Sequence, residues 1–250
     1  MRIVCSVIVL YSSLVLPARG FSQDKAREIV ERAIVAQGGK SKIAKLRCMR
    51  IKVEGTTDFV PGHPNLPFTI EDMWQMPDRY KTSSTIQFNG EKHVQTEVIN
   101  GSAGWSQLDG VSMDLPKEAL AEMKEQKYAE DFDRFGFLKD KNVELSTVAD
   151  ITVNGKPAAG ILIKSKGHRD VKLYFDKATG LLVKREHRLP DTSPGRLVLQ
   201  EVLFSDYQDK DGLKHYRKLV LYRDGKKVVD ARVTEIEFFD KLDAKAFAKP

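Results

Sequence analysis

Residues 68–88, FTIEDMWQMPDRYKTSSTIQF, have the pattern of two β-strands joined by a tight turn. Apolar residues recur at alternate positions in both halves of this stretch: Phe68, Ile70, Trp74, Met76, Tyr80, Ile86 and Phe88. A period near two predicts strands that each bury mainly one face. Asp72 and Met73 interrupt the alternation of the first strand. Pro77 cannot donate to a strand ladder and Asp78 suits the position after it, so these two residues predict the turn.

The apolar face of this hairpin has to be covered by a second sheet, a helix or a ligand. Further strands are predicted on both sides of it, separated by explicit turns such as Asn154-Gly155, Asp211-Gly212 and Asp224-Gly225. The expected strands lie near residues 49–55, 93–99, 105–108, 143–153, 159–164, 171–176, 181–187, 197–207, 217–223 and 227–238.

Two details of the later strands carry specific predictions. Leu199, Leu203 and Tyr207 follow a period of two and are expected to share one face. In the last strand the apolar phase moves by one residue between Val233 and Ile236, which predicts a β-bulge.

Two helices accompany the strands. Residues 25–37 show the amphipathic spacing of a helix, and Gly38-Gly39 follows as a stop. A second helix is expected from the Asp114-Leu115-Pro116 segment to about Arg134. Its imperfect apolar stripe is either part of the core or the inner side of a lid, and consists of Leu120, Met123, Tyr128, Phe132 and Phe135.

These elements predict an α+β fold. We expect a single unclosed antiparallel β-barrel, a half-barrel of about eleven strands, with helices covering its concave face. The space inside such a half-barrel is wide for its own side chains to fill, so an apolar cavity is expected there. The sequence shows no linker and no break in composition, which indicates one domain over residues 21–250.

The N-terminal 20 residues have the pattern of a secretory signal peptide. Arg2 precedes an apolar run over residues 3–16, and Pro17-Ala18-Arg19-Gly20 places small residues before a cut at Phe21. The alternative is a membrane anchor, but the run is shorter than the roughly 20 apolar residues that a spanning helix needs. We therefore expect cleavage and a periplasmic protein.

Composition and charge narrow the class of protein. The chain has 250 residues, of which 41% are hydrophobic and 30% charged, as in ordinary soluble proteins. The net charge is +6, and loss of Arg2 and Arg19 with the signal peptide leaves 39 basic and 35 acidic residues, or +4. This excess is spread along the chain without basic clusters between aromatic residues, so no nucleic-acid partner is expected.

Sequence motifs of catalysis are absent. There is no nucleophile elbow, phosphate loop, HExxH or CxxC motif, and the five histidines are far apart in the sequence. Cys48 precedes a strand and is interpreted as a buried, inert thiol. The acidic turn at residues 206–212 lacks the closing Glu of a calcium loop. We therefore predict no enzymatic activity, no metal and no cofactor, with a periplasmic hydrolase as the weaker alternative.

Four segments, taken in order, resemble the LolA/LolB family of periplasmic carriers and receptors for outer-membrane lipoproteins. The first is the helix that ends at Gly38-Gly39 before a strand. Residues 74–80, WQMPDRY, resemble the family's Trp and Pro-Asn turn, and residues 98–105 its hairpin. Residues 242–250, LDAKAFAKP, are similar to its closing Asp-x-x-x-Phe-x-x-Pro segment.

The resemblance implies an unclosed barrel whose helices form a lid over a cavity for acyl chains. Family carriers have Arg directly before the Pro of the turn, whereas this chain has Met76; the aromatic residue after the turn matches Tyr80. We expect a cavity for lipid or lipoprotein acyl chains, with membrane-bound donor or acceptor proteins as partners and a monomeric carrier. The residues expected to line it are Phe68, Ile70, Trp74, Met76, Tyr80, Ile86, Phe88, Trp105, Leu120 and Met123. A sensor or interaction domain with a filled core is the alternative.

Overall fold

The computed structural model describes residues 18–136, 142–191 and 195–250. The first helix, α1 (Ala18–Gln37), begins seven residues before the predicted start at Lys25 and includes the residues that flank the predicted cleavage site. The predicted signal peptide covers residues 1–20, of which 1–17 lie outside the described residues. Among the described helices, none is both long enough and apolar enough to cross a bilayer.

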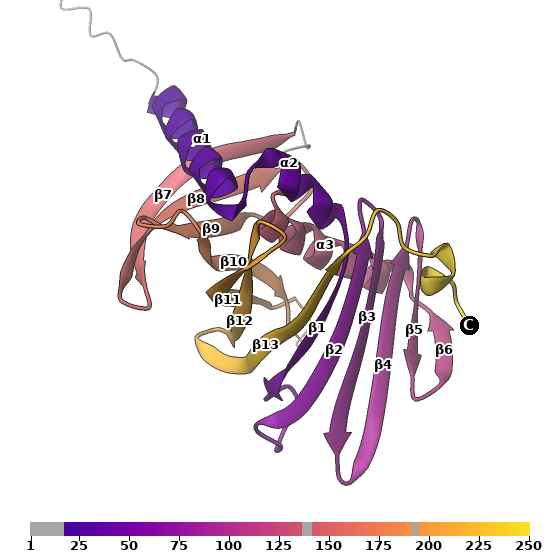
Figure 1. The fold of residues 1–250 in the computed structure, drawn as a ribbon. Coiled ribbons are helices and arrows are strands. Elements are labelled where there is room, and N and C mark those ends of the chain that lie inside the picture. Colours follow the sequence, from indigo (N-terminus) through magenta and orange to yellow (C-terminus); the bar gives the residue numbers. More distant parts are fainter. Residues whose placement is uncertain (1–17, 137–141, 192–194) are drawn as a thin grey trace, which may run out of the picture.

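One antiparallel sheet of thirteen strands forms the body of the molecule (Figure 1). Its order is β6-β5-β4-β3-β2-β1-β13-β12-β11-β10-β9-β8-β7. Consecutive strands therefore pair with each other except β6 and β7, which form the two edges, and β1 pairs in addition with β13. The strands are β1 (Cys48–Thr57), β2 (Leu66–Gln75), β3 (Arg79–Phe88), β4 (Glu91–Asn100), β5 (Ala103–Leu108), β6 (Val111–Asp114), β7 (Val143–Val153), β8 (Lys156–Ser165), β9 (Val171–Asp176), β10 (Leu182–Pro190), β11 (Leu197–Lys210), β12 (Leu213–Arg223) and β13 (Lys226–Phe238).

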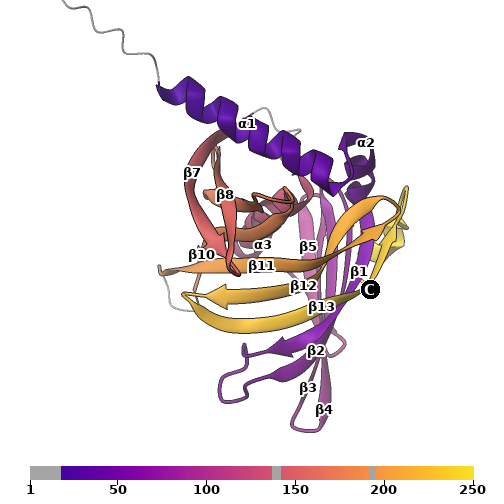
Figure 2. The ribbon, with the colours of Figure 1, turned by 60° about the vertical axis from the view of Figure 1, so that its left-hand side comes forward.

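The predicted α+β half-barrel is confirmed, with thirteen strands instead of about eleven. The short edge strand β6 was not predicted. The sheet curls without closing, so β1–β5 and β10–β13 form two walls around a concave side (Figure 2). The predicted Asp211-Gly212 turn has positive φ at both residues, 56° and 77°, a combination that suits a two-residue hairpin and that Gly adopts without strain.

Two backbone irregularities, one in β13 and one in β11, change which face of the sheet the following side chains occupy. The predicted bulge in β13 is confirmed, because Lys52 pairs with Glu235 while Val53 pairs with Val233. In β11 the predicted shared face is wrong. Leu203 packs on the convex side of the sheet, whereas Tyr207 packs against the main core. Asp206 between them has a φ of +55°, a local break that moves Tyr207 to the other face.

The hairpin of β2 and β3 keeps its alternation throughout, contrary to the predicted interruption. Asp72 lies in phase with Ile70 and Trp74 on the concave face. Its carboxylate accepts a hydrogen bond of 2.8 Å from the Tyr80 hydroxyl, which explains how a charged group is tolerated among apolar neighbours.

Helices cover the concave side at two places. Helix α1 packs against β7, β8 and β12, and its buried residues Ala26, Val30, Ala33 and Ile34 join the main core. Short helical turns, α2 (Lys40–Ile43) and η1 (Ala44–Arg47), lead into β1. Helix α3 (Lys117–Asp131) and the turn η2 (Phe132–Arg134) lie inside the curl of the sheet. A last turn, η4 (Ala244–Phe247), packs near β3 and β4.

Candidate functional site

A cavity of about 590 Å³ lies between the concave face and the segment formed by α3 and η2. We call residues 117–134 the roof and this space the larger cavity. The opposite wall, which we call the floor, is mainly apolar and is built from β1, β2, β3, β11, β12 and β13. The floor residues are Ile51, Val53, Phe68, Ile70, Trp74, Tyr80, Ile86, Val202, Phe204, Leu219, Leu221, Val229 and Ala231.

Strand register explains why these residues meet. Trp74 pairs with Tyr80 across the first hairpin, and Phe68 pairs with Ile86 at its other end. Because residues that face each other in a ladder project to the same side, alternate residues of β1–β4 form one continuous surface. Gln95 and Glu97 of β4 extend this surface and add polar groups to it.

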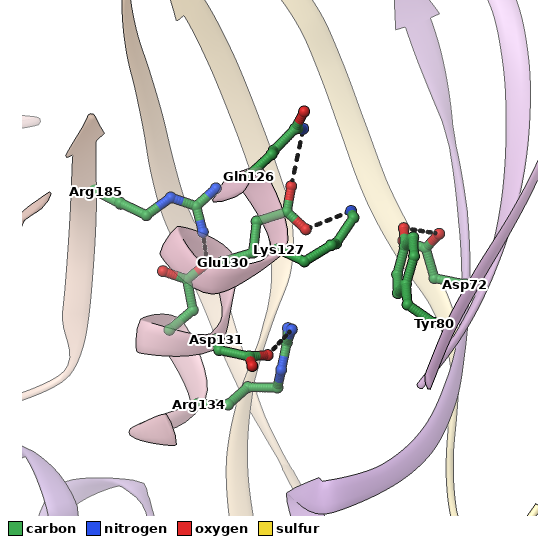
Figure 3. A network of polar contacts seen from close by, with 9 residues as sticks. Asp72, Tyr80, Gln126, Lys127, Glu130, Asp131, Arg134 and Arg185 are labelled. Carbon is green, nitrogen blue, oxygen red and sulfur yellow. Dashed lines mark hydrogen bonds and ion pairs between the residues drawn. The ribbon is translucent and has the colours of Figure 1, made fainter. Parts of the chain in front are cut away.

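The roof presents charged and polar side chains to the larger cavity, contrary to the apolar inner side that one reading of its sequence suggested. The roof residues that line it are Gln126, Lys127, Glu130, Asp133 and Arg134, and Arg185 of β10 joins them (Figure 3). Phe132 and Phe135 are instead buried in the main core. The site is therefore amphipathic, with an apolar floor and an ionic roof.

Ion pairs organise the roof. Lys127 Nζ lies 2.6 Å from Glu130 Oε2, and Gln126 donates to the other carboxylate oxygen of Glu130 at 3.1 Å. Arg185 pairs with Asp133, and both side chains are almost completely buried. Arg134 lies 3.2 Å from Asp131 Oδ1. Removing one member of the buried Arg185–Asp133 pair would leave an uncompensated charge, which costs about 3–5 kcal/mol.

The pKa values of the carboxyl groups diverge within this network. Burial alone would raise the pKa of Glu130, but the positive charges of Lys127 and Arg185 outweigh it and lower the pKa to about 2. Burial dominates at Asp133 and raises its pKa to about 6, against the opposing effect of Arg185. Burial also raises the pKa of Asp72.

Two cations of the roof lie over aromatic rings of the floor. Lys127 Nζ is 3.8 Å from the centre of the Tyr80 ring, and the guanidinium carbon of Arg134 is 4.2 Å from the centre of the Trp74 ring. These cation–π contacts join α3 and η2 to the hairpin of β2 and β3. The two rings are themselves stacked, with centres 6.5 Å apart.

A smaller cavity of about 280 Å³ lies beside the larger one. Four residues line both spaces, namely Trp74, Tyr80, Lys127 and Arg134. The two cation–π contacts therefore lie at the boundary between the cavities. The smaller cavity reaches the turn between β2 and β3, where Pro77 and Arg79 line it.

The structure brings half of the sequence-predicted site residues together. Phe68, Ile70, Trp74, Tyr80 and Ile86 line the larger cavity. Their role in binding remains a prediction.

Five predicted residues lie elsewhere. Met76 lines the smaller cavity and an outer groove of about 810 Å³ beside Cys48. Phe88 packs against His63 and His93. Leu120 and Met123 pack against the main core without lining any of these spaces.

Trp105 lies on the opposite, convex face of the sheet. It is packed with Val98 and Phe247, and its Nε1 donates to the Phe247 carbonyl oxygen at 3.3 Å. Its partner in the ladder, Val98, alternates with the cavity residue Glu97, which accounts for the placement. The closing segment of the chain therefore covers Trp105, and the tryptophan does not line the larger cavity.

Sequence reasoning missed the ionic residues of the site. Asp72 has the same phase as Ile70 and Trp74, so strict alternation could have placed it in the cavity. Glu130 and Asp133 do not belong to the apolar stripe of the predicted second helix. Arg185 is surrounded in the sequence by other charged residues, and no local pattern distinguishes it.

Comparison with known proteins supports the fold. No family model matches the sequence, and no curated protein sequence matches it significantly. A LolA superfamily protein from Nitrosomonas europaea has a similar structure, with a TM-score of 0.56 and 12% identity over 90% of this chain and 97% of that chain. An outer-membrane lipoprotein-sorting protein domain from Vibrio parahaemolyticus has a TM-score of 0.54 and 12% identity over the same shares, 90% and 97%.

A DUF1329 family protein from Desulfovibrio piger is similar to the same degree, with a TM-score of 0.54 and 10% identity over 89% of this chain and 97% of that chain. The resemblance to LolA-like proteins is thus confirmed at the level of the fold. At these identities the likeness extends to the fold alone.

Proposed function

We propose that this protein is a periplasmic, non-enzymatic carrier or receptor that binds the acyl chains of a lipid or lipoprotein in the larger cavity. The observation that carries the proposal is the continuous apolar floor beneath α3. Its volume, about 590 Å³, falls within the range of small-molecule binding sites. Outer-membrane lipoprotein sorting, with loading and release at membrane-bound partners, is the process that this binding would serve.

Apolar burial supplies the affinity in this proposal. Each buried CH₂ group contributes about 0.8 kcal/mol, so one long acyl chain binds well without a catalytic group. Side chains of the floor come from strands that pair continuously, and a rigid wall of this kind loses little conformational entropy when a ligand binds.

An interaction domain with a filled core fits the structure less well, because a cavity of this volume remains beneath the roof. A hydrolase would need a nucleophile beside a base. Cys48 is buried outside the larger cavity, and burial raises the pKa of its thiol. These observations favour the carrier.

The substitution Ile70→Asn tests the floor directly. Ile70 lines the cavity, whereas the adjacent Thr69 projects from the other face and is exposed, so Thr69→Asn is a matched control. A buried aliphatic side chain contributes about 1.5–3 kcal/mol, and we expect Ile70→Asn to weaken binding of a fluorescent fatty acid by roughly tenfold or more. Equal affinities of the two variants would contradict the proposed site.

A further inference from the structure

The smaller cavity differs from the larger one in charge. Four cationic side chains line it, from Arg79, Lys124, Lys127 and Arg134, against the two carboxylates of Asp78 and Asp131. Counting the lysine, arginine and aspartate side chains, its lining has a net charge of +2. The larger cavity has three cations, Lys127, Arg134 and Arg185, against four carboxylates, so its lining has a net charge of −1.

The cations of the smaller cavity come from two elements that face each other. Lys124, Lys127 and Arg134 recur along one side of α3 and η2 at spacings of three and seven residues. Arg79 begins β3 directly after the turn. Neither Arg79 nor Lys124 forms an ion pair or a side-chain hydrogen bond with the described residues, so both charges are available to a ligand.

Unsatisfied donors lie at the boundary of the two cavities. Trp74 is 4% exposed, and its Nε1 has no hydrogen-bond partner among the described residues. The Nε of Arg134 likewise has none. Both groups are N–H donors, and a buried donor without an acceptor is costly. Oxygen atoms of an anionic group are the acceptors that this combination of donors and positive charge favours.

We infer that the smaller cavity is a head-group subsite and that the ligand is an amphiphile with an anionic, oxygen-rich head group, such as a phosphate ester. The head group binds among Arg79, Lys124 and Arg134, and the acyl chain extends past the Tyr80 and Trp74 rings onto the floor of the larger cavity. This inference rests on the proposed function, because the tail occupies the cavity assigned there.

Two probes that differ only in the phosphate test this subsite by isothermal titration calorimetry: myristoyl lysophosphatidic acid and monomyristoylglycerol, both below their critical micelle concentrations. We expect the phosphate probe to bind at least about tenfold more tightly, the effect of one charge-assisted hydrogen bond. The double substitution Arg79→Gln and Lys124→Gln should abolish most of this preference while the affinity for monomyristoylglycerol stays unchanged.

The matched control is the double substitution Lys92→Gln and Lys117→Gln, which removes two exposed lysines that line neither cavity and should retain the preference. Equal binding of the two probes by the wild-type protein would overturn the head-group subsite and leave the carrier intact. Failure of both probes to bind would overturn the carrier itself. Tight binding of inorganic phosphate alone, at the affinity of the phosphate probe, would overturn the amphiphile in favour of a free oxyanion.

Discussion

At the scale of single residues, the site is defined by charged groups held in an apolar enclosure. Burial and ion pairing act in opposite directions on their pKa values, and the balance differs from one carboxyl group to the next. Glu130 stays ionised down to about pH 2, because Lys127 and Arg185 outweigh its burial. Asp133 gains a proton near pH 6, because its burial outweighs the effect of Arg185.

The raised pKa of Asp133 predicts a pH dependence of stability. An acid whose pKa is higher in the folded than in the unfolded protein binds more protons when folded, so its contribution to stability falls as pH rises from about 4 to about 6. We expect the free energy of unfolding of the wild type, relative to Asp133→Asn, to increase by up to about 3 kcal/mol as pH decreases through this window. Urea denaturation at several pH values measures it.

In that experiment, Glu118→Gln provides the comparison, because Glu118 is an exposed carboxylate of α3 that lines neither cavity. A difference between wild type and Asp133→Asn that stays constant from pH 4 to pH 7 would show that burial does not control this proton.

At the scale of elements, the position of α3 depends on a close approach to β5. A Cβ atom on Gly104 would lie 2.6 Å from Leu120 Cδ1 and 2.9 Å from the Val98 carbonyl oxygen. The backbone N–H of Leu115 also donates to the Gly104 carbonyl oxygen at 3.0 Å. The start of the helix therefore rests directly on the backbone of β5, which fixes the height of the roof above the floor.

The substitution Gly104→Ala should displace the roof. Overpacking of this kind costs about 1–3 kcal/mol, and we expect a loss of stability in that range together with faster amide exchange in α3. The double variant Gly104→Ala and Leu120→Ala should recover part of the loss, because it removes one of the two clashes. Additive effects of the two substitutions would argue against the contact between β5 and α3.

Elements also differ in how well the sequence predicts them. Strand periodicity and turn residues predicted the hairpin of β2 and β3 and the bulge of β13, because those signals are local. The face of Tyr207 was predicted wrongly, because the positive φ of Asp206 interrupts the strand alternation. The residue types around Asp206 do not predict this backbone conformation. The polar character of the inner side of α3 and η2 was also missed. Phe132 and Phe135 pack into the main core, and Glu130 and Asp133 line the cavity instead.

At the scale of the whole molecule, a half-barrel of many strands encloses more space than its side chains fill. Because β1 to β13 pair continuously, the apolar floor follows from alternation, and five predicted residues meet there. The ionic roof depends on tertiary packing of α3 and η2 against β10, as in the pair of Asp133 and Arg185. The periodicity of the sequence does not predict such contacts. The charged groups of the roof distinguish this cavity from a purely apolar container, in keeping with the amphiphilic ligand that we propose.

Native mass spectrometry of the protein purified from cells without detergent tests the central claim most directly. The account predicts a fraction of molecules with an added mass of an acyl-containing compound, which dissociates on activation and is displaced by an excess of fluorescent fatty acid. A single apo mass, together with no binding of the fluorescent fatty acid, would contradict it.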